Sequence, residues 1–446
     1  MKSIFSSLLL LFIVYGSNAQ SLNHKMDELV SAYAKAGKFN GTVLVAQKGN
    51  IIFEKAFGLR DGASKATHEI NDIFQIGSVT KQFTAAIIMQ LQVERKLSLK
   101  DKLSKYYPDF PNGEKITIEN LLTHTSGIYN YTNDTSLMKN DVAKHFSEKQ
   151  VIATFKNRPL DFEPGTKWNY SNSGYSLLGY IIAKVTKKPY ELAMRERILY
   201  PLGMSSSGFD FTNLKNAQKS TGYFSLSNDG SVPSPIVDST ITYSAGALYS
   251  TVGDLYKWER AIYTDKILKQ DAWKKVFIPF KNNYGYGWGI DSAFGKLRTS
   301  HGGGIHGFTS YLMRFPKEEL VVIMLDNSSA GSLSTISNSL AAIAFGKPYE
   351  IPGERKEIKV DVSTLQQYVG DYELAPNFII TVSIEKDALV AQATGQPKFN
   401  VYAEKENFFF LKVVDAQVEF IKDSVGKVTE MVLYQNGQKP RGKKIK

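Results

Sequence analysis

Three short motifs in this sequence carry residue types that can do acyl-transfer chemistry. They are Ser-Val-Thr-Lys at residues 78–81, Tyr-Ser-Asn at residues 170–172 and His-Gly-Gly at residues 301–303. Together they supply a hydroxyl nucleophile, two groups that can carry a proton, and a glycine-rich segment whose backbone amides can stabilise an oxyanion. The combination predicts an enzyme that works through an acylated serine.

The nucleophile has to be chosen by its context. A serine three positions before a lysine also occurs at Ser136, Ser383 and Ser424. Of the four, Ser78 stands just before a stretch, residues 83–93, that is apolar on nearly every side and predicts a buried helix. Residues three apart share a helix face, so we expect Lys81 beside the Ser78 hydroxyl in the first turn of this helix. Ser78 is therefore the predicted nucleophile.

The sequence leaves the general base open between Lys81 and Tyr170. A lysine is a base only while neutral, and lowering its pKa from about 10.4 to about 7.4 costs roughly 4 kcal/mol. Full burial is able to lower a lysine pKa that far, so a buried helix permits the role. In the alternative, Lys81 stays charged and lowers the pKa of the Tyr170 phenol, which is then the base. Tyr170 and Asn172 are expected in a short polar loop before a second apolar helix.

The third motif combines a histidine with glycines that permit close backbone approach. We expect Gly303 and Gly304 at the oxyanion, with the Gly304 amide as the second donor beside that of Ser78, and His301 to bind substrate or assist proton transfer. A zinc site at His301 and His306 is not expected, because the sequence has no Cys and no His-Glu-x-x-His motif. No metal and no organic cofactor is predicted.

Longer blocks around these motifs resemble those of the serine β-lactamase-like hydrolases: class C β-lactamases, D-alanyl-D-alanine carboxypeptidases, D-aminopeptidases and related esterases. The resemblance spans roughly residues 25–345, and its blocks are Ile116–Ile128, Phe162–Gly179, Pro201–Met204 and His301–Phe308. It implies an α+β fold of the β-lactamase/transpeptidase type, with an antiparallel sheet flanked by helices and a helical subdomain.

The same resemblance implies roles for individual residues. It makes Ser78 the nucleophile, has Tyr170 act in proton transfer with Lys81, and lets Asn172 contact Lys81 and the substrate. The β-lactamases usually carry Lys-Thr-Gly at the third motif, where the lysine holds a substrate carboxylate. A neutral His301 is a poorer anchor, so an esterase or peptidase-like activity is favoured over efficient β-lactam hydrolysis.

An alternative hypothesis is a protein of the same fold that does not turn over a substrate. The chain would then be a penicillin-sensing or cell-wall-binding module whose Ser78 is acylated but scarcely released. The complete motifs argue against it. Substrate choice is expected to depend on loops such as residues 129–145 and 209–239, which carry no readable signature.

Composition is consistent with an exported enzyme. Residues 1–19 combine Lys2, an apolar core and a Ser-Asn-Ala end, which predicts a signal peptide and a periplasmic or secreted location. No segment of the remaining chain is long and apolar enough to predict a membrane span. The net charge of +11 suits an anionic cell-wall surface or simply a solvated exterior, and no motif indicates nucleic-acid binding. A small molecule or cell-wall peptide is the expected substrate, and the oligomeric state is left open.

The chain is long enough for more than one domain. We expect a hydrolase domain at residues 20–348, opening with a helix at 22–36 and a hairpin that turns at Gly49, and closing with strands and a helix. A charged, proline-containing linker follows at 349–360. Short alternating strands then predict a small all-β domain at 361–446, and the basic end, residues 439–446, is expected to be a frayed tail.

Overall fold

The computed structural model describes residues 21–227, 230–328, 331–352, 357–376, 378–412, 416–435 and 439–446, so the expected signal peptide lies outside the described residues. The chain divides into two compact units, one ending at Ile351 and the other beginning at Pro352. Within the described ranges, no helix combines the length and the apolar character needed to cross a membrane.

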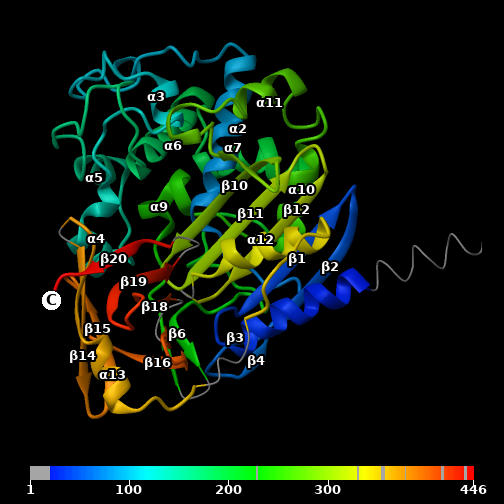
Figure 1. Ribbon diagram of the computed structural model, residues 1–446. Helices are drawn as coiled ribbons and strands as arrows, with labels where there is room; N and C mark the ends of the chain where they lie inside the picture. The colour runs from blue at the N-terminus through cyan, green and yellow to red at the C-terminus, as the bar shows by residue number, and fades with distance from the viewer. Residues whose placement is uncertain are drawn as a thin grey trace, which may run out of the picture. The chain divides into compact units, whose positions relative to one another are not determined.

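The first unit is built on a six-stranded antiparallel sheet with the strand order β2-β1-β12-β11-β10-β9 (Figure 1). Its strands are β1 (Gly41–Gln47), β2 (Asn50–Phe57), β9 (Gly289–Ala293), β10 (Lys296–Ile305), β11 (Phe308–Phe315) and β12 (Leu320–Asp326). Strands from the beginning and the end of the unit therefore join in one sheet around the helices between them, which confirms the predicted α+β arrangement.

The sheet is buried on both faces because its central strands alternate between two cores. In β1, Val43 and Val45 pack in one core with the helix at residues 21–35 and with α12 (Leu333–Ala344). Leu44 and Ala46, the residues between and after them, pack in the other core with the helical region. This explains why β1 reads as a continuous apolar run rather than as an alternating pattern.

The helical region lies between β5 (Phe74–Gln75) and β9. Its α-helices are α2 (Thr80–Val93), α3 (Ile118–Leu122), α4 (Thr135–Asn140), α5 (Glu148–Ala153), α6 (Asn172–Thr186), α7 (Tyr190–Met194), α8 (Tyr200–Leu202), α9 (Ser239–Gly246), α10 (Val252–Ala261) and α11 (Gln270–Val276). Its short 3-10 and π turns are η1 (Gly77–Val79), η2 (Leu103–Lys105), η3 (Tyr131–Asn133), η4 (Arg195–Leu199) and η5 (Lys281–Asn283). Helix α2 is buried from Thr80 to Met89 without interruption, as its apolar composition predicted.

Three two-stranded sheets complete the first unit. They pair β3 (Leu59–Asp61) with β4 (Ala66–Thr67), β5 (Phe74–Gln75) with β8 (Tyr249–Ser250), and β6 (Tyr223–Ser227) with β7 (Gly230–Pro233). The His-Gly-Gly motif lies at the end of strand β10, which the sequence did not predict, and β11 follows it. Its glycines have low strand propensity, which hid the strand from the sequence.

The second unit is a closed eight-stranded barrel (Figure 1). Helix α13 (Val362–Tyr368), which the sequence did not predict, precedes its strands β13 (Gly370–Ala375), β14 (Phe378–Glu385), β15 (Ala388–Ala393), β16 (Phe399–Lys405), β17 (Phe408–Leu411), β18 (Ala416–Lys422), β19 (Val428–Gln435) and β20 (Arg441–Lys444). The expectation of a frayed basic tail is wrong, because β20 pairs with both β19 and β13 and closes the barrel. Backbone hydrogen bonds rather than apolar side chains hold it.

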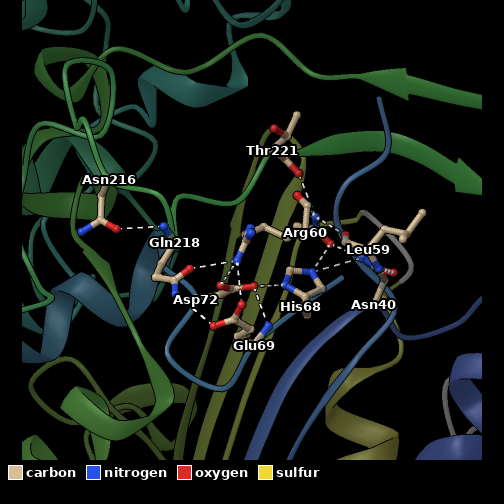
Figure 2. Close-up of polar contacts among 10 residues, drawn as sticks. Asn40, Leu59, Arg60, His68, Glu69, Asp72, Asn216, Gln218 and Thr221 are labelled. Carbon is tan, nitrogen blue, oxygen red and sulfur yellow. Dashed lines mark hydrogen bonds and ion pairs between the residues drawn. The ribbon is translucent and has the colours of Figure 1, made fainter. Parts of the chain in front are cut away.

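A partly buried polar cluster ties four distant segments of the first unit together. We call it the Arg60 cluster, and its side chains are Asn40, Arg60, His68, Asp72, Gln218 and Asn327. Arg60 donates to Asp72 (3.0 Å) and to Gln218 (2.8 Å), and the His68 imidazole lies 2.7 Å from the other Asp72 oxygen (Figure 2). The Asn327 side-chain amide donates a hydrogen bond to the Thr221 carbonyl oxygen (2.8 Å). Every group named here has a partner inside the cluster.

Candidate active site

Ser78 lies on a turn that the neighbouring strand crosses at very short range. The turn is η1, which leads directly into α2, so Ser78 precedes the helix instead of occupying its first turn. Gly77 has a φ of +49°, which is not helical, and a Cβ on it would lie 2.8 Å from the Gly304 nitrogen. A Cβ on Gly303 would lie 2.0 Å from the Ile76 oxygen. Glycine is therefore required on both sides of this contact.

Lys81 is completely buried and has three close polar neighbours. Its Nζ lies 3.0 Å from Ser78 Oγ, 2.7 Å from Asn172 Oδ1 and 2.7 Å from the Ala245 carbonyl oxygen. No carboxylate is among these partners. Burial alone holds the pKa of the Lys81 amine well below its usual value.

The neighbours of Lys81 determine where the lone pair of a neutral amine points. An amide oxygen and a carbonyl oxygen can only accept, so the two hydrogens of a neutral –NH2 are directed to Asn172 and Ala245. The remaining direction faces Ser78 Oγ, which can then donate its own proton to Nζ. The arrangement is therefore able to take a proton from the serine hydroxyl.

Asn172 begins α6 and is held by residues at the start of η3, about 40 positions earlier in the sequence. Its Nδ2 donates to Thr132 Oγ1 (3.0 Å) and its backbone amide donates to Asn130 Oδ1 (3.0 Å). Thr132 in turn donates to the same Asn130 oxygen. These bonds fix the Asn172 amide with its oxygen toward Lys81.

The ring of Tyr170 lies 4.8 Å from Lys81 Nζ. Its hydroxyl is enclosed and forms no well-aligned hydrogen bond with a described residue, although the Ser78 hydroxyl is near enough to affect its pKa. Burial raises the pKa of the Tyr170 phenol, and the Ser78 hydroxyl opposes this only in part. At neutral pH the phenol is therefore a proton donor near the serine.

His124 holds the loop that carries Tyr170 from both sides. Its carbonyl accepts from the Asn169 amide (3.0 Å) and its Nδ1 accepts from the Ser171 amide (3.2 Å). Its ring centroid lies 4.3 Å from that of Tyr170. Burial, followed by the charge of Lys81, holds the pKa of the His124 imidazole well below its usual value, which keeps Nδ1 an acceptor.

The residues of the third motif lie at the site in different ways. His301 is buried, with Nε2 2.8 Å from the Tyr284 hydroxyl and Nδ1 2.6 Å from the Gly302 carbonyl oxygen, so both ring nitrogens are engaged within the protein. Burial and the charge of Lys81 lower the pKa of His301 to about 4. His301 and Gly303 do not line the cavity beside Ser78, whereas Gly304 does.

The cavity beside Ser78 has a volume of about 290 Å³. Ser78, Asn172 and Gly304 line it, and the loops named from the sequence contribute Thr132, Met138 and Phe224 to its lining. His306, which follows β10, also lines it. Within the described residues, no cluster of His, Asp or Glu is suited to hold a metal ion.

Sequence reasoning missed the contributions of four residues to this site. The Ala245 carbonyl has no side-chain signature, and α9 presents it by means of a kink at Tyr243 (φ 38°). Tyr284 contacts His301, and Thr132 accepts a hydrogen bond from Asn172; neither contact is between neighbours in the sequence. His124 is part of the block Ile116–Ile128. The residues that follow it, Thr125, Ser126 and Gly127, are typical of a turn and could have indicated its position.

Two family models match this chain. The Beta-lactamase family model matches residues 26–343, and a family described as a domain of unknown function (DUF3471) matches residues 354–444. A Bacillus subtilis penicillin-binding protein is 27% identical over 96% of this chain and 100% of its own length.

Two solved structures extend the comparison. The octameric penicillin-binding protein homologue from Pyrococcus abyssi is 27% identical with a TM-score of 0.67, covering 94% of this chain and 99% of that one. A D-stereospecific amidohydrolase from a Streptomyces species is 26% identical with a TM-score of 0.62, covering 71% of this chain and 99% of that one. The chain belongs to the β-lactamase family and is a serine hydrolase.

Proposed function

We propose that this chain hydrolyses an amide or ester bond through an acyl-enzyme on Ser78. The observation that carries the proposal is the environment of Lys81: a buried amine without a carboxylate, whose two acceptor-only partners leave its third direction for Ser78 Oγ. This arrangement favours the neutral amine that a general base requires.

In the proposed reaction, Ser78 Oγ attacks the substrate carbonyl carbon and its proton passes to Lys81 Nζ. The amides of Ser78 and Gly304 donate to the oxyanion that forms. The Tyr170 hydroxyl gives its proton to the leaving nitrogen or oxygen as the bond breaks, and recovers a proton from Lys81. Water then attacks the acyl carbon and gives its proton to the same base, and Ser78 Oγ regains a proton as it leaves.

The expected substrate is an ester or a D-amino-acid amide or peptide, with β-lactams as slower substrates. The relatives support this choice because their descriptions include penicillin-binding proteins and a D-stereospecific amidohydrolase. We also propose that residues 1–19 direct export, so that the substrate is met in the periplasm or outside the cell.

Turnover by the mature protein and by two serine variants tests the proposal. The panel contains p-nitrophenyl acetate and butyrate, a D-alanine p-nitroanilide, a D-Ala-D-Ala peptide and nitrocefin. Ser78→Ala is expected to lose at least about 10⁴-fold in kcat/KM, while Ser136→Ala, which changes the exposed serine of another S-x-x-K pattern, keeps full activity.

Mass spectrometry after rapid quenching distinguishes the remaining outcomes. An adduct on the peptide that contains Ser78, with product accumulating, supports the acyl-enzyme. A lasting adduct without product would replace this proposal by the non-turnover penicillin-sensing module. Equal activity in wild type and Ser78→Ala would remove Ser78 from the reaction.

A further inference from the structure

The walls of the Ser78 cavity carry no formal charge among the residues that the structure describes. No Lys, Arg, Asp or Glu side chain lines it. His306 does, and burial lowers the pKa of its imidazole, so it is uncharged at neutral pH. The chain as a whole is strongly basic, with a net charge of +11, so a neutral cavity is a local property and not a reflection of composition.

Most of the polar side chains that line the cavity already have partners. The Thr242 hydroxyl and His306 Nδ1 have none among the described residues, but neither carries a charge at neutral pH. The Tyr131 hydroxyl donates to the Ile241 carbonyl (2.6 Å), and the Thr132 hydroxyl donates to Asn130 and accepts from Asn172. The Asn172 oxygen is taken by Lys81. A carboxylate or ammonium group that enters the cavity would therefore lose its water without gaining an opposite charge.

Apolar side chains form much of the remaining wall. Met138, Phe224 and Ile305 line the cavity. The Phe224 and His306 rings pack in a T-shaped arrangement with their centroids 5.6 Å apart. Phe224 is 47% exposed, a large fraction for an aromatic ring in a folded protein. Such a surface gains free energy when an apolar substrate group covers it.

We propose, resting on the proposed function, that this site selects substrates that are uncharged on both sides of the scissile bond. The substrate class is an N-acylated amino-acid amide or ester with an apolar side chain, blocked at both ends. A peptide with a free terminal carboxylate, and an amino-acid amide with a free ammonium group, are poor substrates. Desolvation of an unpaired charge is the physical cause of the discrimination.

Matched substrate pairs measure this selection directly. The first pair is N-acetyl-D-alanyl-D-alanine and its C-terminal methyl ester, compared for cleavage of the D-alanyl-D-alanine peptide bond. The second pair is D-phenylalanine amide and N-acetyl-D-phenylalanine amide. In each pair we expect the uncharged member to have a kcat/KM at least about 100-fold higher at pH 7. Equal rates, or faster cleavage of the charged members, would overturn the inference.

A gain-of-function variant separates charge from shape. Phe224→Arg places a cation on a partly exposed wall position and is expected to raise the carboxylate-to-ester ratio of kcat/KM at least about tenfold. Val232→Arg is the matched control, because Val232 lies on the paired strand β7, is 55% exposed and does not line the cavity. The same rise in both variants would assign the effect to overall charge and contradict the inference.

The inference and the proposed function fail in different ways. Activity that is unchanged in Ser78→Ala defeats the function, whereas Ser78-dependent cleavage that prefers charged substrates defeats only the inference. If no pair is turned over, protection of Ser78 from a fluorophosphonate probe measures the affinity for each member. Protection by the uncharged member at lower concentration supports the inference, and equal protection overturns it.

Discussion

The Arg60 cluster and the Ser78 site both bury charged side chains in the first unit, but they treat charge differently. In the Arg60 cluster, Asp72 faces Arg60 at 3.0 Å and His68 at 2.7 Å, so the carboxylate has a cation and an imidazole as partners (Figure 2). At the Ser78 site, the partners of Lys81 among the described residues are uncharged, and the enclosed Tyr170 hydroxyl has only the neutral Ser78 hydroxyl nearby.

The difference follows from what each group of side chains has to do. A buried charge without an opposite charge is unfavourable, so a cluster that only holds segments together pairs its charges. A general base has to give up its charge, and a buried lysine without a carboxylate does so readily. A carboxylate beside Lys81 would stabilise the ammonium form and remove the base. We therefore expect the Arg60 cluster to determine stability and the Ser78 site to determine activity.

Lys81→Met gives the largest expected effect. Removal of the base should lower kcat/KM by about 10⁴-fold, as for groups that act as one unit with the nucleophile. The free energy of unfolding should change little, because loss of a desolvated amine offsets the loss of its three hydrogen bonds. Steady-state kinetics and urea unfolding measure the two quantities. Activity within tenfold of wild type would contradict the role of Lys81.

Asp72→Ala should show the opposite behaviour. It leaves Arg60 and His68 buried without their carboxylate, which should cost about 3–5 kcal/mol of unfolding free energy. Well below the unfolding midpoint, kcat should stay within a few-fold of wild type. Asp271→Ala is the control, because Asp271 pairs with Lys274 on the surface at 93% exposure; its effect should be below about 1 kcal/mol. Equal losses in both variants would remove the distinction between the two regions.

Tyr170→Phe keeps the ring against Lys81 and removes the hydroxyl. We expect kcat/KM to fall about 10²- to 10³-fold. Since burial lowers the pKa of Lys81 and raises that of Tyr170, activity should rise with pH as Lys81 loses its proton, below 10.5. The variant should keep this acidic limb at a lower plateau. If the acidic limb is absent from the pH–rate profile of Tyr170→Phe, Tyr170 is the base instead of Lys81.

Much of the framework could be predicted from local pattern. The apolar residues around Ser78 indicated the buried helix α2, and the spacing of three residues predicted that Lys81 would lie beside the Ser78 hydroxyl, where it is found at 3.0 Å. The hairpin of β1 and β2 and the strand β11 followed from apolar runs between turn residues. These features depend on neighbours in the sequence. The catalytic and binding roles of the site residues remain predictions: Ser78, Lys81, Tyr170, Asn172, His301, Gly303 and Gly304.

The rest depended on contacts between distant residues. Strand β20 is Arg-Gly-Lys-Lys, which has no apolar residue, and is a strand only because β13 and β19 both offer it backbone partners. The Ala245 carbonyl reaches Lys81 from 164 positions away. His301 was expected to bind substrate or assist proton transfer, which stays a prediction. Its ring nitrogens contact the Tyr284 hydroxyl and the Gly302 carbonyl oxygen, and the sequence did not indicate the contact with Tyr284.

His124 gives the smallest expected effect and tests how far the site depends on such contacts. Its φ of 57° favours glycine and asparagine, so His124→Gly and His124→Asn avoid backbone strain equally. Only asparagine has a side-chain oxygen that can replace Nδ1 as acceptor for the Ser171 amide. His124→Gly should lower kcat about tenfold with little change in KM, because Tyr170 loses its fixed position. His124→Asn should recover most of this loss, and equal kcat values in the two variants would show that the bond to Ser171 does not position Tyr170.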